Sequence, residues 1–216
     1  MRLAIISANL GAFDAPAKPP VTQVWVDATP HLFTSATMPP RPLALSSRLH
    51  AKIPKMFGWD LCPGYDAYLW HDASLALTVA DSGRWCVDHL GDHDILVFRH
   101  PERHTIHEEA EFLRHKARHP YIRTRYAGED LDHQLASIER DTLYVDDRLF
   151  AAGAFCYRPT AAIRHAFTDW WHHVTRYHVN DQLAFPYVLR ACDVAVLDED
   201  IYHASHLTWT RGTGHE

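Results

Sequence analysis

The stretch Tyr65–Leu77 reads Y-D-A-Y-L-W-H-D-A-S-L-A-L, and its pattern decides how the rest of the chain is interpreted. Apolar residues 67–70 lead directly into His71, Asp72 and Ser74, and a second apolar run follows. A short continuous apolar run predicts a buried strand. Many α/β folds place a charged ligand or a metal where such a strand ends. The alternative interpretation is that Asp72 only caps a turn.

Regular elements on both sides of this stretch predict an α/β fold. Strands that alternate with helices indicate a three-layer α/β/α sandwich with a mixed, mainly parallel central sheet. Pro54 is expected to end a helix that begins near Ser46, and the proline-rich residues 29–42 are expected to form no regular element. The expected strands are 3–8, 21–27, 94–98, 149–157 and 194–197, and the expected helices are about 46–53, 105–118, 130–140, one capped by Thr160 and one capped by Asn180.

Composition limits the class of protein. With 216 residues, the chain is expected to form one domain, with a nucleotide-binding half at about 1–100 and an acceptor-side half at about 101–216. The net charge of −6 counts against non-specific nucleic-acid binding. Four widely spaced cysteines predict neither a zinc site nor a disulfide framework. The short apolar run at the start predicts a first strand rather than a signal peptide or a membrane anchor, so a cytoplasmic protein is expected.

Candidate ligand groups follow the predicted strands. Asn9 lies in the loop after the first strand, where a nucleotide commonly binds in such folds. Arg48 and Lys52 are spaced i, i+4, so both cations lie on one helix face, as a diphosphate clamp or simply as a solvated basic face. The Asp72 carboxylate suits Mg²⁺ or Mn²⁺, and the His71 imidazole suits Mn²⁺ better than Mg²⁺.

Several segments, taken in order, resemble a known family. They are L-H-A-K-I-P-K-M-F with Y-D-A-Y-L-W-H-D-A-S (49–74), F-R-H-P-E-R-H-T-I-H-E-E-A (98–110), G-A-F-C-Y-R (153–158), the W-W pair and N-D-Q-L-A-F (180–185). The order and spacing resemble the glycosyltransferase-like domain family that includes the plant turgor-regulation-defect and mucilage-related proteins. That family is similar in architecture to the GT-A class of nucleotide-sugar transferases. The resemblance covers roughly residues 45–190.

The resemblance implies positions for several functional residues. It places Lys52 near the donor diphosphate and Asp72 at the second acid of the Asp-x-Asp metal motif, with Trp70 in place of the first acid. Arg158 matches the arginine after the glycine-containing strand. The family's R-D-Q pattern is N-D-Q here, so Asp181 and the glutamine after it match, whereas the preceding arginine does not.

The leading hypothesis is sugar transfer from a nucleotide-diphosphate donor to a hydroxyl group, assisted by Mn²⁺ or Mg²⁺. The acceptor is expected to be a glycan, lipid, protein, small molecule or, as a less favoured option, a modified DNA base. Asp181 is the candidate base or sugar ligand, and its alternative role is a first-turn acid stabilised by the helix dipole. The full set comprises Asp181, Gln182 and Glu109 as catalytic candidates, Asn9, Arg48, Lys52, Asp72 and Arg158 for the donor, and Asp72, His71, His203 and His206 for the metal.

Two other hypotheses stay open from the sequence. A metal-dependent hydrolase of an amide or phosphodiester would use His71, Asp72, His100 and His104, although the chain has no H-E-x-x-H motif. A non-catalytic module that binds nucleotide sugars would explain the missing first acid of Asp-x-Asp.

Overall fold

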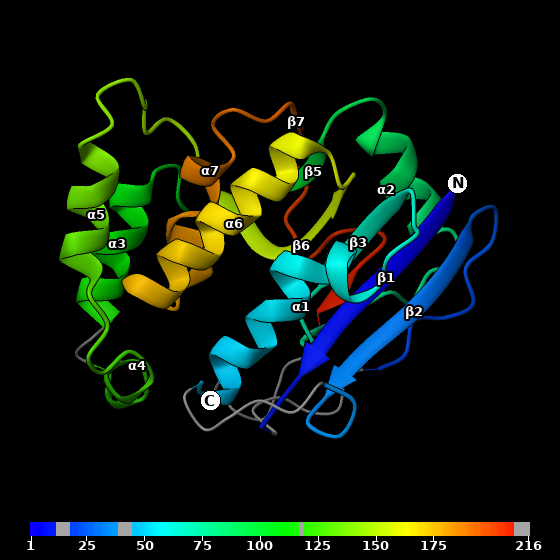
Figure 1. Cartoon of the computed structure of the whole chain (residues 1–216), viewed down its shortest axis with the longest axis horizontal. Coiled ribbons are helices and arrows are strands. Elements are labelled where there is room, and N and C mark those ends of the chain that lie inside the picture. The colour runs from blue at the N-terminus through cyan, green and yellow to red at the C-terminus, as the bar shows by residue number, and fades with distance from the viewer. Residues whose placement is uncertain (12–17, 39–44, 117–118, 210–216) are drawn as a thin grey trace.

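A six-stranded sheet forms the centre of the computed structural model, which describes residues 1–11, 18–38, 45–116 and 119–209 (Figure 1). Its strand order is β2-β1-β3-β6-β5-β7. Strand β6 pairs antiparallel with β3 and β5, whereas the β1–β2, β1–β3 and β5–β7 pairs are parallel. The expected mixed, mainly parallel sheet is therefore confirmed. The strands are β1 Arg2–Asn9, β2 Asp27–Thr34, β3 Ala67–His71, β5 Ile95–Arg99, β6 Phe150–Tyr157 and β7 Val194–Leu197.

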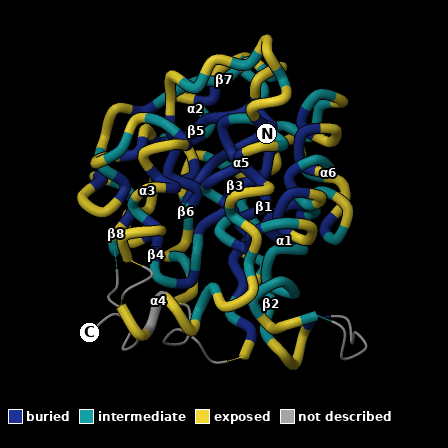
Figure 2. The backbone as a smooth tube through the Cα atoms, turned by 90° about the vertical axis from the view of Figure 1, so that its left-hand side faces the viewer, coloured by how far each residue is buried: buried dark blue, intermediate teal, exposed yellow. Residues whose placement is uncertain are grey.

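Helices and a small second sheet cover the two faces of the central sheet. On one face lie α1 (Ser47–Leu61) and α6 (Ala161–Arg176), whose apolar side chains share one core cluster with Tyr68 and Trp70 of β3. On the other face, Leu69 packs in a cluster with α2 (Ser82–Leu90), β4 (Leu75–Ala76) and β8 (Thr208–Trp209). Side chains alternate across a strand, so β3 contributes to both clusters. Figure 2 shows this buried sheet between more exposed layers, which confirms the three-layer expectation.

A third group of helices lies beside the sheet, at the left of Figure 1. It buries its own small core, which includes Ile106, Leu113, Leu135 and Leu183. None of the described helices is long and apolar enough to cross a membrane. The helix expected at 105–118 is present, although residues 117–118 lie outside the described ranges. The elements of this group are α3 Ile106–Lys116, α4 Pro120–Arg125, α5 Leu131–Glu139 and the 3₁₀ helix η1 Asp181–Leu183, and α7 Phe185–Val188 follows η1 and packs in the core cluster of α1 and α6.

The structure corrects two expectations that were based on proline. The second strand is Asp27–Thr34 rather than 21–27, and it contains Pro30. Proline is tolerated there because β2 is an edge strand, and no strand on its outer side needs the N–H group that proline lacks. Helix α1 begins as expected, with the Ser46 Oγ accepting from the Leu49 N–H, but it continues past Pro54 to Leu61 with a kink at Phe57. The part of the helix beyond Pro54 begins with Lys55, which is buried.

Gly153 sits where β6 departs from regular pairing. The register with β5 shifts between Val97 and Phe98, so the strand has a local irregularity at this glycine. Its carbonyl accepts the Asp72 N–H at 2.7 Å. A Cβ at this position would lie 3.3 Å from side chains of Leu75 and Ile201 and 3.8 Å from the Asp72 Oδ2. The glycine thus lets the strand approach the end of β3 closely and fixes the position of Asp72.

Candidate functional site

A cavity of about 680 Å³ opens where β1, β3 and β5 end. Asn9 ends β1, Asp72 follows β3, and the segment after β5 adds Arg103 to the wall. Helix α1 and the segment at 200–203 close the remaining sides. Three of the predicted candidates, Asn9, Lys52 and Asp72, thus line one cavity at the carboxyl ends of these strands. The charged lining residues are Arg48, Lys52, Lys55, Arg103, Arg125, Asp72, Glu102 and Asp200.

Two lysines of α1 and two carboxylates form an ion network at the base of the cavity. The Asp181 Oδ2 lies 2.5 Å from the Lys52 Nζ and 2.6 Å from the Lys55 Nζ. The Lys55 Nζ also donates to the Asp72 Oδ1 at 3.2 Å. That same oxygen accepts from the Trp70 Nε1 at 2.9 Å. Lys55 thus joins the end of β3 to η1, two segments far apart in the sequence.

Burial and the neighbouring charges shift the pKa values of this network in opposite directions. Burial would raise the pKa of Asp181, but Lys52 and Lys55 outweigh it and hold that pKa well below its usual range. Burial would lower the pKa of Lys55, but Asp181 and Asp72 outweigh it and raise that pKa. For Lys52, desolvation wins over the attraction of Asp181, and its pKa is lowered. Asp181 is therefore held as an anion, and such a carboxylate is a weak proton acceptor.

Lys55 is a cavity residue that the sequence-based prediction did not include, and Arg103 is another. The spacing of Lys52 and Lys55 is i, i+3, which places both on one face of a helix. The expectation that Pro54 ends the helix removed Lys55 from that face. The side chain is 1% exposed, and its ammonium lies 5.5 Å from the Trp70 ring centroid and 5.8 Å from that of Trp170. The spacing of the two lysines in K-I-P-K (52–55) is the sequence feature that could have predicted it.

Buried side chains behind the cavity wall hold Arg103 in position. Glu109, 2% exposed on α3, accepts from the Arg103 Nε at 2.5 Å and from the Asn180 Nδ2 at 3.2 Å. Asn180 in turn caps η1 by accepting the Gln182 N–H at 3.1 Å. The Arg103 guanidinium also lies 3.9 Å from the Phe112 ring centroid. The carboxylate of Glu109 is thus engaged on both sides, which suits a positioning residue rather than a base.

Further predicted residues line the same region. Asn9, Arg48 and His203 line the main cavity, and the Arg48 guanidinium donates to the Arg125 carbonyl. Gln182 lines a smaller adjoining hollow of about 120 Å³, which Asp72 shares. The predicted donor-side residues therefore come together, with one exception.

That exception is Arg158, which lies at the opposite end of the sheet. Strand β6 runs antiparallel to β3, with Tyr157 opposite Tyr68 and Ala154 opposite His71. The arginine that follows Tyr157 therefore lies near the beginning of β3, and its guanidinium donates to the His93 carbonyl at 2.9 Å. Arg158 therefore does not line the cavity with the other predicted donor-side residues, because the strand that leads to it points away from the cavity.

The histidines predicted as metal ligands are dispersed. His71 is buried, and its Nδ1 lies 2.9 Å from the Leu75 carbonyl oxygen, with burial lowering its pKa. His206 stacks on Trp85 with ring centroids 4.6 Å apart, on the α2 side of the sheet. His203 lines the cavity, with its Nδ1 2.8 Å from Asp200.

The donor set at Asp72 does not fit a metal held by the protein. Within the described ranges, no group of three or more His, Cys, Asp or Glu side chains could hold a metal ion. The Asp72 Oδ1 already accepts from a tryptophan and from Lys55. Among the described residues the four-residue ligand set of the hydrolase hypothesis is likewise not assembled: the His100 Nδ1 accepts the backbone N–H groups of Glu102 and Arg103, and its Nε2 lies 2.9 Å from the Arg103 Nη2.

Comparisons with known proteins add a distant likeness. No family model matches the chain, and no curated protein matches it. The apo structure of the bifunctional glycosyltransferase WbbM has 14% identity and a TM-score of 0.46, over 79% of this chain and 28% of that one. A glycosyltransferase involved in glycosylation of the major capsid of PBCV-1 has 9% identity and a TM-score of 0.45, over 93% of this chain and 82% of that one. A197 from STIV has 7% identity and a TM-score of 0.40, over 92% and 82%. Similarities this low do not by themselves assign a function, and the predicted plant family stays a prediction.

Proposed function

We propose that this chain transfers a sugar from a nucleotide-diphosphate donor to a hydroxyl acceptor. The observation that carries the proposal is the charge of the main cavity. Five cationic and three anionic side chains line it, although the whole chain has a net charge of −6. A concentration of cations at the carboxyl edge of an α/β sheet suits a diphosphate bound at a strand crevice.

The chemical step places new negative charge on the leaving group. The bond between the anomeric carbon and the diphosphate oxygen breaks, and its electron pair stays with the diphosphate. The acceptor oxygen forms the new bond to carbon, and its proton passes to water. Lys52, Arg48 and Arg103 would stabilise the leaving diphosphate, because cations placed beforehand in a partly dry site lower the cost of developing charge.

Asp181 would act in this reaction as a positioning residue. Its carboxylate holds both lysine ammonium groups, at 2.5 Å and 2.6 Å. An acid so engaged fixes the two cations at the cavity base and is poorly suited to accept the acceptor's proton. This observation favours a second candidate function, a module that binds nucleotide sugars without turning them over.

Thermal stabilisation by nucleotides tests the proposal. Nucleoside diphosphates and nucleotide sugars carrying each common base would be added to the purified chain, and the melting temperature measured. We expect one base to raise it by several degrees, because a ligand that binds the folded state stabilises it. A flat response to every nucleotide would refute both the transferase and the binding-module proposals.

Matched variants locate the binding, and turnover separates the two candidates. Lys52→Met should lose the nucleotide-induced shift, whereas Lys18→Met, at an exposed position that does not line the cavity, should keep it. Release of nucleoside diphosphate from the stabilising nucleotide sugar, in the presence of candidate acceptors, reports turnover. Binding with no release would favour the non-catalytic module.

A further inference from the structure

We propose that the cation partner of Asp72 is Lys55 of the chain itself, so that the donor diphosphate is bound without a divalent metal ion. This inference rests on the proposed function and goes against the expectation of Mn²⁺ or Mg²⁺ drawn from the sequence. Its basis is the set of groups that surrounds Asp72.

The Asp72 Oδ1 is occupied by two donors from the chain. The Trp70 Nε1 lies 2.9 Å from it and the Lys55 Nζ lies 3.2 Å from it. A metal bound to that oxygen would need to displace at least one of these donors, and a metal bound to either oxygen of the carboxylate would be repelled by the nearby Lys55 ammonium. Trp70 stands where an Asp-x-Asp motif would have its first acid, so the site has a hydrogen-bond donor in place of a second carboxylate.

Lys55 is held firmly at this position. Its side chain is 1% exposed, and its ammonium is bound by Asp72 on one side and by Asp181, at 2.6 Å, on the other. Trp70 and Trp170 lie within 5.8 Å of the ammonium, in cation–π range. Moving a paired, buried ammonium aside would leave two carboxylates without it, which is a costly change.

This arrangement also explains how an acid can line a site for an anionic ligand. The Asp72 side chain is 42% exposed, so it faces the cavity. Lys55 offsets its charge from beneath, which reduces the repulsion that a diphosphate would otherwise meet. Lys52, with Arg48 and Arg103 on the walls, then supplies the charge that the diphosphate needs. The cations that a metal would provide are thus part of the chain.

Nucleotide affinity with and without metal is the first test. The stabilising nucleoside diphosphate would be titrated calorimetrically into the wild-type chain, once in EDTA and once in Mn²⁺. We expect the two dissociation constants to agree within about threefold, which is a difference in binding free energy well under 1.4 kcal/mol. Binding at least about tenfold tighter in Mn²⁺ would overturn this inference and leave the proposed function standing. Absence of binding in both buffers would overturn the proposed function, and this inference with it.

Direct Mn²⁺ binding gives a readout that needs no nucleotide. Electron paramagnetic resonance of free Mn²⁺, titrated with wild-type chain, should show no ion taken up at Asp72. Uptake that disappears in Asp72→Asn would overturn the inference. Since this measurement uses the wild-type chain, it stands even if a lysine variant does not fold.

Removing the lysine should create the site that it replaces. In Lys55→Met, Asp72 and Asp181 would face the same vacated position, and two carboxylates suit Mn²⁺. We expect this variant to take up Mn²⁺ while Lys18→Met does not, with circular dichroism checking that both are folded. A folded Lys55→Met chain that takes up no more Mn²⁺ than wild type would count against the inference.

Discussion

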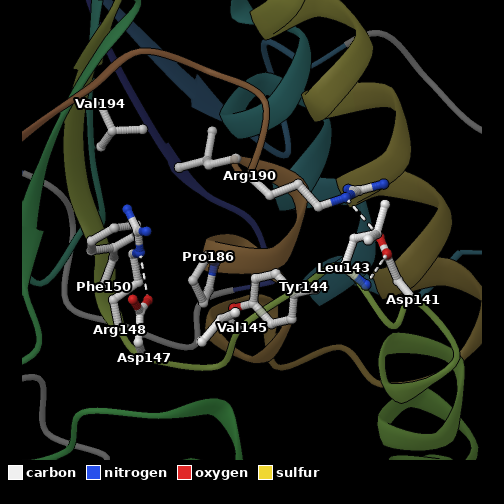
Figure 3. A pocket seen from close by; sticks show the side chains of 11 residues that line it. Asp141, Leu143, Tyr144, Val145, Asp147, Arg148, Phe150, Pro186, Arg190 and Val194 are labelled. Carbon is white, nitrogen blue, oxygen red and sulfur yellow. Dashed lines mark hydrogen bonds and ion pairs between the residues drawn. The ribbon is translucent and has the colours of Figure 1, made fainter.

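Two cavities of similar size lie in this molecule, and they differ in where their charges are buried. The main cavity, about 680 Å³, has Lys55 at its base, bound to Asp181 of the adjoining hollow, and both side chains are at most 10% exposed. The second cavity, about 510 Å³, lies between the segment 141–150, α7 and the start of β7. Figure 3 shows its two ion pairs, Arg190 with Asp141 and Arg148 with Asp147, at separate places around the hollow.

The ion pairs of the second cavity are partly open to solvent. The Arg190 and Asp141 side chains are 36% and 26% exposed, and those of Arg148 and Asp147 are 52% and 54% exposed. Each pair in Figure 3 joins one cation to one acid. In the main cavity, by contrast, Lys55 joins two acids from different parts of the fold. The two cavities therefore differ little in volume, and they differ in the burial of their ion pairs and in the sharing of Lys55 by two acids. Buried charges with shifted pKa values are typical of functional sites.

The largest expected effect is on stability, from the loss of the shared charge. Lys55→Met leaves Asp72 and Asp181 without their common partner, and we expect a loss of about 3–5 kcal/mol in unfolding free energy. Urea denaturation followed by circular dichroism measures it. Arg148→Met, the matched change in the second cavity, should stay within about 1 kcal/mol of wild type. Equal losses for the two variants would remove the distinction drawn between the cavities.

The buried acid behind the main cavity should also matter more than an exposed acid on the same helix. Glu109→Gln weakens the charge-assisted bond to Arg103, and we expect a cost of about 2–3 kcal/mol together with weaker nucleotide binding. Glu111→Gln is the control, because that side chain is 72% exposed. Calorimetry and urea denaturation give the two readouts. Unchanged nucleotide binding in a folded Glu109→Gln chain would show that Arg103 does not depend on this acid.

Acid pH should destabilise the chain through a buried histidine near each cavity. Burial, aided by Arg103 for His100 and by His172 for His173, lowers both pKa values to about 4. Between pH 6.5 and about 4 the unfolded chain then binds more protons than the folded chain, so stability falls as pH is lowered through this window and levels off below it. Between pH 7 and 5 we expect about 2 kcal/mol for each histidine.

Urea denaturation at the two pH values, for wild type, His100→Gln and His173→Gln, measures these contributions. Each variant should show a smaller loss on acidification than wild type. A variant whose loss equals that of wild type would show that its histidine remains able to take up a proton in the folded state.

The smallest expected effect is at the rim of the second cavity. Asp141→Asn weakens the pair with Arg190, whose atoms lie 3.1 Å apart, and we expect at most about 1 kcal/mol because the pair is partly solvated. Nucleotide-induced stabilisation should be unchanged. A loss of nucleotide binding in this variant would move the ligand site to the second cavity and reverse the comparison.

Much of the fold could be predicted from local patterns. The apolar run at 67–70 gives β3, Thr160 caps α6, and Asn180 caps η1, because a polar cap and a periodic apolar face are local properties. The position of Asp72 at a strand end followed in the same way. The predictions at two prolines failed because the effect of a proline depends on the surrounding structure. Pro30 is tolerated because β2 lies at the sheet edge. Pro54 lies within α1, and the packing of α1 against the sheet helps to stabilise that helix.

The sequence by itself determined most of the central strands and the long helices, apart from the bounds of β2 and α1, and that Asn9, Lys52 and Asp72 lie near one edge of the sheet. The tertiary structure alone decided which charges meet. Strand direction is not encoded in an apolar run, so Arg158 was expected in the site until the antiparallel β6 placed it at the other end. The meeting of Lys55 with Asp181 joins positions 126 residues apart, and only the packing of α1 against the sheet and η1 brings those two charges together.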